Sequence, residues 1–268
     1  MDGDRFKERV AQSFSRFAAT YDHYAAEQRV GAETLGDCAA ALAPGLVAGP
    51  VLEIGCGTGI LSERLVDLLP GRKLELTDLS PAMVARCRDR IAAAGIGHPG
   101  IDYGVLDGER VMRQGHYALV CAAFAVHWFA DLRQGLTRLF RALKPGGHLL
   151  CAYPGAGSYR EWGEQCRRLG VPWTANSLPV MSSVAGVFHQ HPVAIRQWEQ
   201  EVVVRHASAR AFLHHVKCTG AGVRTRSACG LLGPAEMRRL LRGWDQACPG
   251  GVEITCAIHY LAVERQGG

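Results

Sequence analysis

The chain has 268 residues, 48% of them hydrophobic, and a formal net charge of +5 at pH 7. That length and apolar content are sufficient for one large α/β domain with a full core. No run of about 18 apolar residues occurs, which excludes a membrane-spanning helix, and the charged first residues lack the apolar segment of a signal peptide. We therefore expect a cytoplasmic protein that does not act at a membrane.

The ten cysteines form no C-x-x-C pair and are not accompanied by a histidine cluster, so they are expected to be reduced thiols, and no metal site is predicted. The charge is uneven, because residues 1–150 contain 17 basic and 17 acidic side chains whereas residues 151–268 contain 13 and 8. This basic excess is either an ordinary solvated surface or a face for an acidic partner. No dense basic run is present, so nucleic acid is not an expected partner.

Helical and strand-like segments alternate in the first part of the chain. In order, they are helices 5–19 and 23–42, strand 51–54, helix 60–69, strand 73–77, a helix opened by Ser80 and Pro81, strands 101–106 and 117–124, helix 132–143 and strand 148–153. Alternation at this spacing predicts a Rossmann-like α/β fold with a doubly wound, mostly parallel sheet.

The alternation loosens after Pro154. In order, the expected segments are a helix-and-loop stretch 155–198, strand 201–206, helix 209–217, a glycine-rich stretch 220–233, a helix opened by Gly233 and Pro234, and strand 255–264. The last two strands bring the sheet to seven. We predict a single domain spanning 1–268, with a helical lid from about 1–30 and 155–198.

The most informative segment is Val-Leu-Glu-Ile-Gly-Cys-Gly-Thr-Gly, residues 51–59, with Asp78 nineteen positions after its last glycine. A strand that ends in a glycine-rich turn, followed by a second strand that ends in a carboxylate, is typical of a nucleotide-cofactor site. The pattern is G-x-G-x-G rather than the dinucleotide G-x-G-x-x-G, and Glu53 precedes it. A carboxylate there suits a cofactor with a positive end and no phosphate, namely S-adenosylmethionine (SAM). Asp78 is expected to accept both ribose hydroxyls.

The chain resembles class I SAM-dependent methyltransferases over nearly its whole length. The matching motifs are residues 52–59, Asp78-Leu-Ser-Pro-Ala-Met83, Asp107-Gly-Glu109, Ala-Val-His-Trp128 and Leu-Lys-Pro-Gly-Gly147. The resemblance implies that Glu53 and the glycines hold the methionine end, that Asp78 binds the ribose and that Asp107 binds the adenine amino group. The implied cofactor-binding set is Gln28, Glu53, Gly55, Cys56, Gly57, Gly59, Asp78, Leu79, Met83, Asp107, Gly108 and Ala123.

A finer resemblance is to the BioC family, the malonyl-acyl-carrier-protein O-methyltransferases of biotin (pimeloyl) synthesis. It rests on residues 14–28, on Val-Lys217-Cys-Thr-Gly-Ala221 and on Ile254-Thr255. It implies methylation of the free carboxylate of a malonyl thioester, on an acyl-carrier protein or on CoA. The chain departs from the family pattern at Gly222 (often Thr), Cys256 (often Tyr), Ala123 (often Asn), His127 (often Gln) and Asn176 (in place of a lid Arg-Phe).

Methyl transfer from a sulfonium is an in-line displacement, and a carboxylate acceptor is already ionised at pH 7, so no general base is expected. Tyr21 is the candidate for a catalytic contact under the lid, or else a core residue. Lys217 is the first candidate to hold the substrate carboxylate, or else a solvated helix end, with Arg224 and Arg226 next.

Three further residues are ambiguous from the sequence. His127 and Trp128 belong either to the site or to a packed corner, and Glu109 is expected at the surface. Other functions also stay open, namely methylation of a free carboxylic acid, quinone or polyketide intermediate, SAM sensing without catalysis, and nucleic-acid methylation.

Overall fold

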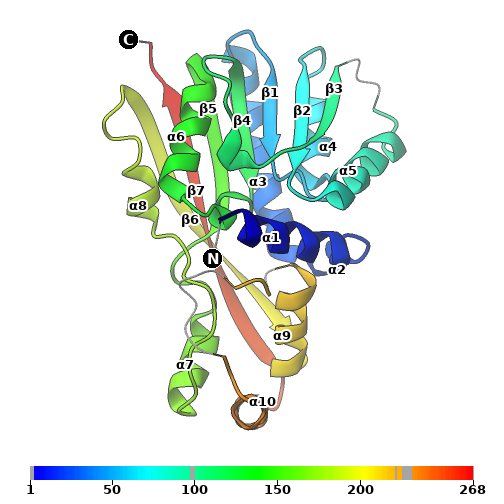
Figure 1. Cartoon of the computed structure of the whole chain (residues 1–268), viewed down its shortest axis with the longest axis vertical. Helices are drawn as coiled ribbons and strands as arrows, with labels where there is room; N and C mark the ends of the chain where they lie inside the picture. Colours follow the sequence, from blue (N-terminus) through cyan, green and yellow to red (C-terminus); the bar gives the residue numbers. More distant parts are fainter. Residues whose placement is uncertain (1–2, 97–99, 221, 225–230, 268) are drawn as a thin grey trace.

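The computed structural model describes residues 3–96, 100–220, 222–224 and 231–267, and within these residues seven strands form one mixed sheet (Figure 1). The strands are β1 (Val51–Ile54), β2 (Leu74–Asp78), β3 (Ile101–Val105), β4 (Tyr117–Ala123), β5 (Leu143–Pro154), β6 (Val193–His206) and β7 (Val252–Arg265). Their order across the sheet is β3-β2-β1-β4-β5-β7-β6. The first five strands pair in parallel, and β7 runs antiparallel between β5 and β6. The predicted seven-stranded, mostly parallel Rossmann-like sheet is confirmed.

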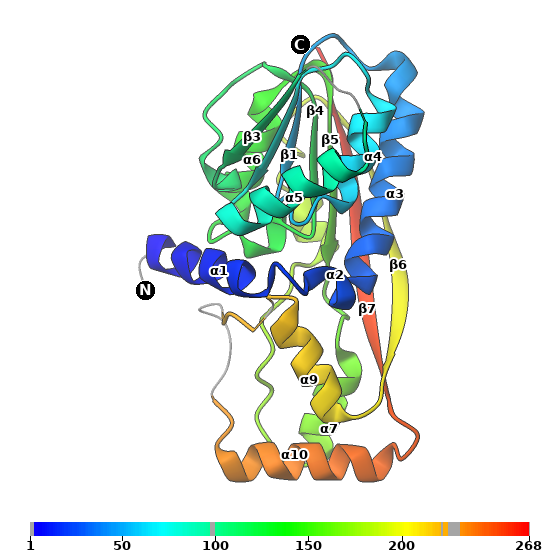
Figure 2. The ribbon, with the colours of Figure 1, turned by 90° about the vertical axis from the view of Figure 1, so that its right-hand side faces the viewer.

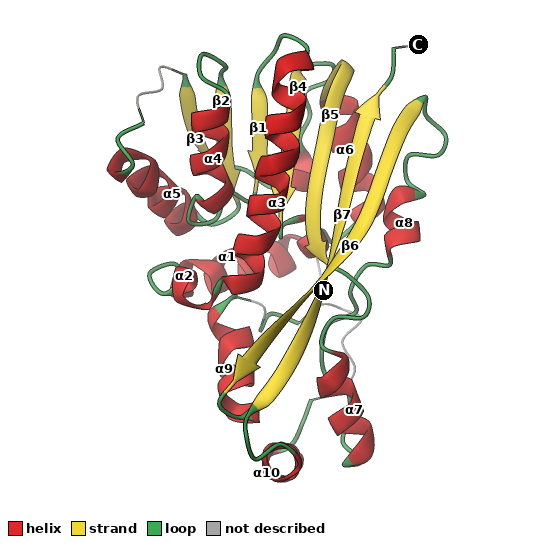
Figure 3. Cartoon of the chain, turned by 180° about the vertical axis from the view of Figure 1, so that it is seen from behind, coloured by secondary structure: helices red, strands yellow, loops and turns green. Residues whose placement is uncertain are grey.

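The helices of the described residues cover both faces of the sheet and its lower end. They are α1 (Gly3–Phe17), α2 (Tyr21–Tyr24), α3 (Ala26–Leu42), α4 (Ile60–Leu68), α5 (Pro81–Ala93), α6 (Leu132–Ala142), α7 (Arg160–Arg168), α8 (Met181–Ala185), α9 (Ala209–Cys218) and α10 (Pro234–Ala247). Seen from behind, α3, α4 and α5 cover one face and α6 lies on the other (Figure 3). All four β1 residues are buried, as expected for a central parallel strand between two helical layers.

Two element boundaries predicted from the sequence were wrong. The stretch assigned to helix and loop, 155–198, ends inside a strand, because β6 already begins at Val193. This strand lies at the sheet edge, none of its residues is buried, and polar residues occupy both of its faces, so its apolar periodicity is weak. The helix predicted over 23–42 is interrupted at Ala25, whose φ of −95° and ψ of 41° are not helical.

Strands β6 and β7 continue beyond the other strands and carry a second helical layer (Figure 3). Helices α7, α9 and α10 pack there around a core that includes Trp162, Phe212, Leu240 and Trp244. Helices α1 and α2 cross between this lower layer and the sheet (Figure 2). The N-terminal segment therefore covers the end of the sheet at which β1, β2 and β4 have their carboxyl ends.

The predicted start of α5 is confirmed, because the Ser80 hydroxyl accepts a hydrogen bond from the Met83 amide at 3.2 Å and Pro81 is the first helical residue. The described cysteines are all free, and most are buried. Within the described residues no helix is long and apolar enough to cross a membrane.

Candidate functional site

The carboxyl ends of β1, β2 and β4 open into two adjoining hollows, which we call together the sheet-edge cavity. The two hollows share the lining residues Tyr21, Gly55, Gly57, Ala123 and Phe124. Eleven of the twelve residues predicted to bind the cofactor line it, namely Gln28, Glu53, Gly55, Cys56, Gly57, Asp78, Leu79, Met83, Asp107, Gly108 and Ala123. The sequence pattern thus brings these residues to one place.

The glycine-rich turn requires glycine for reasons of geometry. Gly55 has a φ of +72°, and a Cβ atom there would lie 2.5 Å from the Cβ of Ala125. Gly59, the remaining predicted residue, lines neither hollow; it has a φ of +92° and precedes the first turn of α4. Gly59 therefore shapes the turn and does not face the cavity.

Glu53 is a buried carboxylate with few partners. Glu53 is only 1% exposed, and one of its carboxylate oxygens accepts a hydrogen bond from the Ser62 hydroxyl at 2.6 Å. Burial raises the pKa of this carboxyl to about 7. In the same cavity, Gln28 has a buried Oε1 atom that accepts no hydrogen bond. Two under-satisfied acceptors in one cavity fit a ligand that brings a cation and N–H donors, as the ammonium of SAM would.

Asp78 is held in place by backbone amides. Its carboxylate accepts hydrogen bonds from Gly57 N at 2.9 Å and Ser80 N at 2.8 Å. Burial raises the pKa of Asp78 to about 6, although these amides act in the opposite direction. A carboxylate has about four acceptor positions, so these amides leave room for a hydroxyl donor from a ligand, as the ribose assignment requires.

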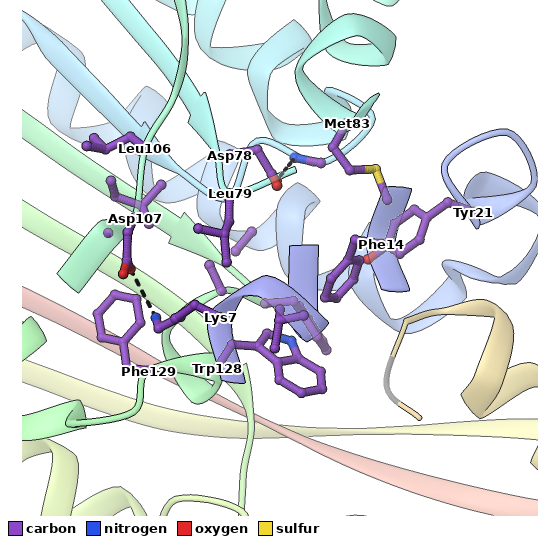
Figure 4. Close-up of a pocket in the computed structure, with 18 residues that line it drawn as sticks. Lys7, Phe14, Tyr21, Asp78, Leu79, Met83, Leu106, Asp107, Trp128 and Phe129 are labelled. Atoms are coloured by element: carbon purple, nitrogen blue, oxygen red, sulfur yellow. Dashed lines mark hydrogen bonds and ion pairs between the residues drawn. The ribbon is translucent and has the colours of Figure 1, made fainter. Parts of the chain in front are cut away.

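Asp107 has a partner that the sequence did not reveal. Lys7 Nζ of α1 lies 3.0 Å from Asp107 Oδ1 (Figure 4). It also pairs with the carboxylate of Glu109. Glu109 is buried and accepts hydrogen bonds from the amides of Ala130 and Asp131, so its expected surface position was wrong. No local sequence signal distinguishes Lys7, because its partners lie about 100 residues away.

An aromatic wall from the N-terminal helices closes the cavity. Phe14 packs edge-on against Trp128, with ring centroids 5.7 Å apart, and lies 6.2 Å from the Tyr21 ring. Tyr21 is buried, and this burial, reinforced by the charge of Asp78, raises the pKa of its phenol. It both lines the cavity and packs against Met83, so the site and core interpretations of Tyr21 are both compatible with its position.

A polar contact fastens α2 to the glycine-rich turn. The Thr58 hydroxyl donates to the Asp22 carboxylate, and Arg90 pairs with the same carboxylate. Arg90 Nε also donates to the Thr58 carbonyl oxygen at 2.8 Å. Together with Lys7, this contact holds the N-terminal segment over the cavity at both of its ends.

A second chamber lies beside the sheet-edge cavity and has Trp128 in common with it. Its volume is about 330 Å³, within the range of small-molecule sites. Its described lining residues are His127, Trp128, Pro154, Tyr159, Trp162, Thr174, Ala175, Asn176, Ser177, Leu178, Leu213, Val216, Gly222, Val223, Arg224, Leu231, Leu232 and Met237. The set is mostly apolar, contains Arg224, and includes no acidic residue among the described part of the chain.

The three basic residues that were candidates to hold the substrate carboxylate differ in their position relative to this chamber. Arg224 lines it, whereas Lys217 is exposed near the end of α9 and lines neither cavity. Its position therefore does not support Lys217 as the direct anchor. Arg226 lies outside the described residues. Asn176, which stands where a lid arginine is common, lines the chamber and donates from Nδ2 to the carbonyl of Val223 at 2.7 Å.

Two lining residues have backbone conformations that are unusual for their type. Among the described residues other than glycine, only Phe124 and Tyr159 have positive φ, at 52° and 62°. Phe124 lines the sheet-edge cavity and Tyr159 lines the second chamber. Such strain persists where the surroundings enforce it and often occurs at functional sites.

Comparisons with known proteins agree with this geometry. A family described as "Methyltransferase domain" matches residues 52–149. The chain is 36% identical over 240 residues to the biotin biosynthesis bifunctional protein BioCD of Bordetella avium, covering 88% of this chain but only 49% of that protein. It is 33% identical over 216 residues to a malonyl-[acyl-carrier protein] O-methyltransferase of Magnetococcus marinus, covering 79% of this chain and 75% of that relative.

Solved structures support the fold alone. The YcgJ protein of Bacillus subtilis aligns with a TM-score of 0.61 at 13% identity, over 87% of this chain and 98% of that one. The [4+2]-cyclase SpnF aligns with a TM-score of 0.52 at 16% identity, over 88% of this chain and 82% of that one. Since a cyclase has this fold, the assignment must rest on the sequence relatives and the site. On that basis, the chain belongs to the malonyl-[acyl-carrier protein] O-methyltransferase family.

Proposed function

We propose that this protein transfers a methyl group from SAM to the free carboxylate of a malonyl thioester, carried by an acyl-carrier protein or by CoA, giving the methyl ester for biotin (pimeloyl) synthesis. The observation that carries the proposal is the pair of cavities that have Trp128 in common. One is lined by the buried carboxylate of Glu53 and the partly buried carboxylate of Asp78, and the other has a basic side chain and no described acid. This contrast suits a cationic donor beside an anionic acceptor.

The sheet-edge cavity is the proposed site of SAM, which supplies an electrophilic methyl group on a positively charged sulfur. Glu53 and Gln28 would hold the ammonium end, and Asp78 would accept from the ribose hydroxyls. Asp107 would accept from the adenine amino group while remaining paired with Lys7. Tyr21 and the rest of the aromatic wall would exclude water from the reacting atoms.

The acceptor chemistry requires positioning rather than proton transfer. One carboxylate oxygen forms a bond to the methyl carbon while the bond from that carbon to sulfur breaks, and both electrons of the broken bond stay on sulfur. A carboxylate is ionised at neutral pH, so no proton has to be removed. The apolar second chamber supports this proposal because it can desolvate a weak nucleophile and align it.

The lid is part of the proposal. Helices α1 and α2 cover the sheet-edge cavity, and residues 174–178 line the second chamber, in line with a lid drawn from about 1–30 and 155–198. We add α9 and residues 222–237 as far as they are described, because Leu213, Val216 and Met237 line the same chamber. This extended lid would enclose both substrates.

An acidic carrier protein fits the outer surface of the lower layer. Arg167 and Arg168 of α7, and Arg238, Arg239 and Arg242 of α10, are exposed. Two carboxylates of α10 are occupied in capping, because Glu236 accepts from Gly233 N at 2.7 Å and Asp245 accepts from Ala209 N at 2.8 Å. Long-range attraction would speed carrier association and weaken with salt.

The test compares methyl transfer to malonyl-carrier protein, malonyl-CoA and free malonate. We expect activity on at least one malonyl thioester and a preference for it over free malonate. Activity confined to a different carboxylic acid would support the alternative, methylation of another small molecule. No methyl transfer to any malonyl compound would refute the malonyl assignment.

The anchor is tested with Arg224→Ala and Lys217→Ala on the malonyl thioester. Removing a group that holds a carboxylate in an apolar chamber should lower kcat/KM by at least about tenfold, so the Arg224 variant is expected to fall that far. The Lys217 variant is expected to stay within about twofold of the wild type at high salt, since its side chain is exposed. The reverse order would restore Lys217 as the anchor.

A further inference from the structure

His127 lies at the junction of the two cavities. It belongs to a one-turn 3-10 helix, Val126–Trp128, that follows β4. Its ring lines the second chamber, and its neighbour Trp128 lines both cavities. The His127 ring lies 5.1 Å from the Trp128 ring and 6.3 Å, edge-on, from the ring of Phe124, which lines the sheet-edge cavity.

The ring nitrogens of this histidine have no hydrogen-bond partner among the described residues. Its Nδ1 is buried and has no hydrogen-bond partner, and no hydrogen bond joins Nε2 to any described residue. Buried polar atoms of folded proteins are almost always paired with protein, water or ligand. The neighbours of the ring are aromatic, so its packing alone does not account for a histidine at this position.

The described surroundings do not support a proton-relay role. Among the described lining residues, the ionisable groups beside His127 are Tyr159 and Arg224, and neither is a carboxylate that could accept a proton from the ring or orient it. Burial alone lowers the pKa of His127 to about 3. The ring is therefore neutral, with one nitrogen that donates and one that accepts.

We propose that His127 is a positioning residue for the acceptor, donating a hydrogen bond from its neutral ring to the group that receives the methyl. A neutral donor orients an anionic oxygen without neutralising it, so the oxygen keeps its nucleophilic character. Arg224 then supplies charge to the anion, whereas His127 fixes its direction near Trp128. This inference rests on the proposed function, because the chamber must hold the acceptor.

The test uses His127→Leu, which removes both nitrogens, and His127→Gln, which keeps an N–H donor of similar reach. His189→Leu is the control, since His189 is exposed and lines neither cavity. The first measurement is the affinity of S-adenosylhomocysteine by titration calorimetry, expected within twofold of wild type in all three variants. The second is the affinity of malonyl-pantetheine for enzyme saturated with S-adenosylhomocysteine, where no reaction occurs.

We expect acceptor affinity to fall 10- to 100-fold in His127→Leu and to stay within threefold of wild type in His127→Gln and His189→Leu. Wild-type acceptor affinity in His127→Leu would overturn the assignment. An equal loss of S-adenosylhomocysteine affinity in that variant would also overturn it, because the role would then be structural. An equal loss of acceptor affinity in His127→Gln would overturn the assignment too, because this variant keeps an N–H donor.

A pH series separates a neutral donor from a charged anchor. With the enzyme saturated with S-adenosylhomocysteine, a neutral ring predicts no His127-dependent change in acceptor affinity between pH 6 and pH 8. A tenfold loss per pH unit in wild type, absent in His127→Gln, would identify an imidazolium and overturn the proposal. If the wild-type complex binds no malonyl thioester, the proposed function fails and this inference fails with it. If wild type binds the malonyl thioester and His127→Leu binds it equally well, only the role of His127 is refuted.

Discussion

Replacing Glu53 with glutamine should separate cofactor binding from stability. Burial raises the pKa of this carboxyl from 4.5 to about 7, so keeping it ionised at pH 8 opposes folding. Each pKa unit corresponds to about 1.4 kcal/mol, which gives about 3 kcal/mol in all. The sign follows from linkage: because the folded pKa is the higher one, this group's contribution to stability is greatest below pH 4.5 and is lost as the pH rises to about 7.

Glutamine removes that charge but adds a buried amide. Ser62 can still donate to the amide oxygen, whereas the amide nitrogen gains no partner. This unpaired nitrogen costs about 1–2 kcal/mol and so offsets part of the stability gained by removing the charge. We expect the ligand-free Glu53→Gln variant to be more stable than wild type at pH 8 by about 1–2 kcal/mol, or roughly 3–5 °C in Tm. The same variant should lose most of its affinity for SAM, because an ammonium would no longer meet a carboxylate.

The assay is urea unfolding of the ligand-free proteins at pH 5 and pH 8, followed by calorimetric titration with SAM. The stability gain should be present at pH 8 and absent at pH 5, and wild-type SAM affinity should rise between pH 6 and pH 8 whereas that of the variant stays flat. Glu33→Gln is the control, since Glu33 is exposed on the same helix that carries Gln28. A variant that is less stable at pH 8, or that binds SAM as wild type does, would refute the reasoning.

Three further outcomes are expected from the same site. Asp78→Ala should weaken SAM binding about 10- to 100-fold by calorimetry, through the loss of two charge-assisted hydrogen bonds; unchanged affinity in a folded variant would contradict the ribose assignment. Lys7→Met should lower the free energy of unfolding by about 3 kcal/mol, because it removes the cation of the buried Glu109 carboxylate and leaves Asp107 with only the more distant Arg110, whereas Lys73→Met, whose ion pair is exposed, should change it by less than about 1 kcal/mol; equal effects in urea unfolding would mean that the Lys7 pair contributes no more than a surface pair. Tyr21→Phe should reduce kcat about tenfold and leave SAM affinity within about twofold; a change in Tm alone would make Tyr21 a core residue.

The sheet-edge cavity could be predicted because its chemistry is local in the sequence. A glycine-rich turn follows β1, and the carboxyl ends of neighbouring parallel strands lie at the same edge of the sheet. Glu53 near the end of β1, Gly55 directly after it and Asp78 at the end of β2 therefore meet there regardless of what covers them. The backbone amides that hold Asp78 come from the same two turns. Each of these relations depends on strand order and turn geometry, which short motifs encode.

The cover and the second chamber could not be predicted in the same way, because they depend on contacts between distant segments. Lys7 meets Asp107 across 100 positions, and a single lysine in an amphipathic helix is otherwise an ordinary surface residue. Lys217 matched a family motif, yet the turn of α9 on which it lies directs its side chain to solvent. The first eight residues of β6 were not recognised as strand, because polar and apolar side chains are mixed on both faces of this edge strand.

The division between the two parts has a physical consequence for specificity. The sheet edge supplies acids on strands that are fixed by parallel pairing, so under the proposed function it would hold a cationic donor whatever the acceptor. The chamber is lined by residues from α7, α9, α10, the loops between them, the end of β5 and the corner after β4. The three helices meet through the apolar core around Trp162 and Trp244, and the corner contributes Trp128, which packs with Val223. Under the proposed function, departures from the family pattern at His127, Asn176 and Gly222, which line the chamber, would change the acceptor side, and none of them lines the hollow that contains Glu53. A chain can keep its methyl donor while its acceptor specificity changes, which is why the acceptor assignment needs its own tests.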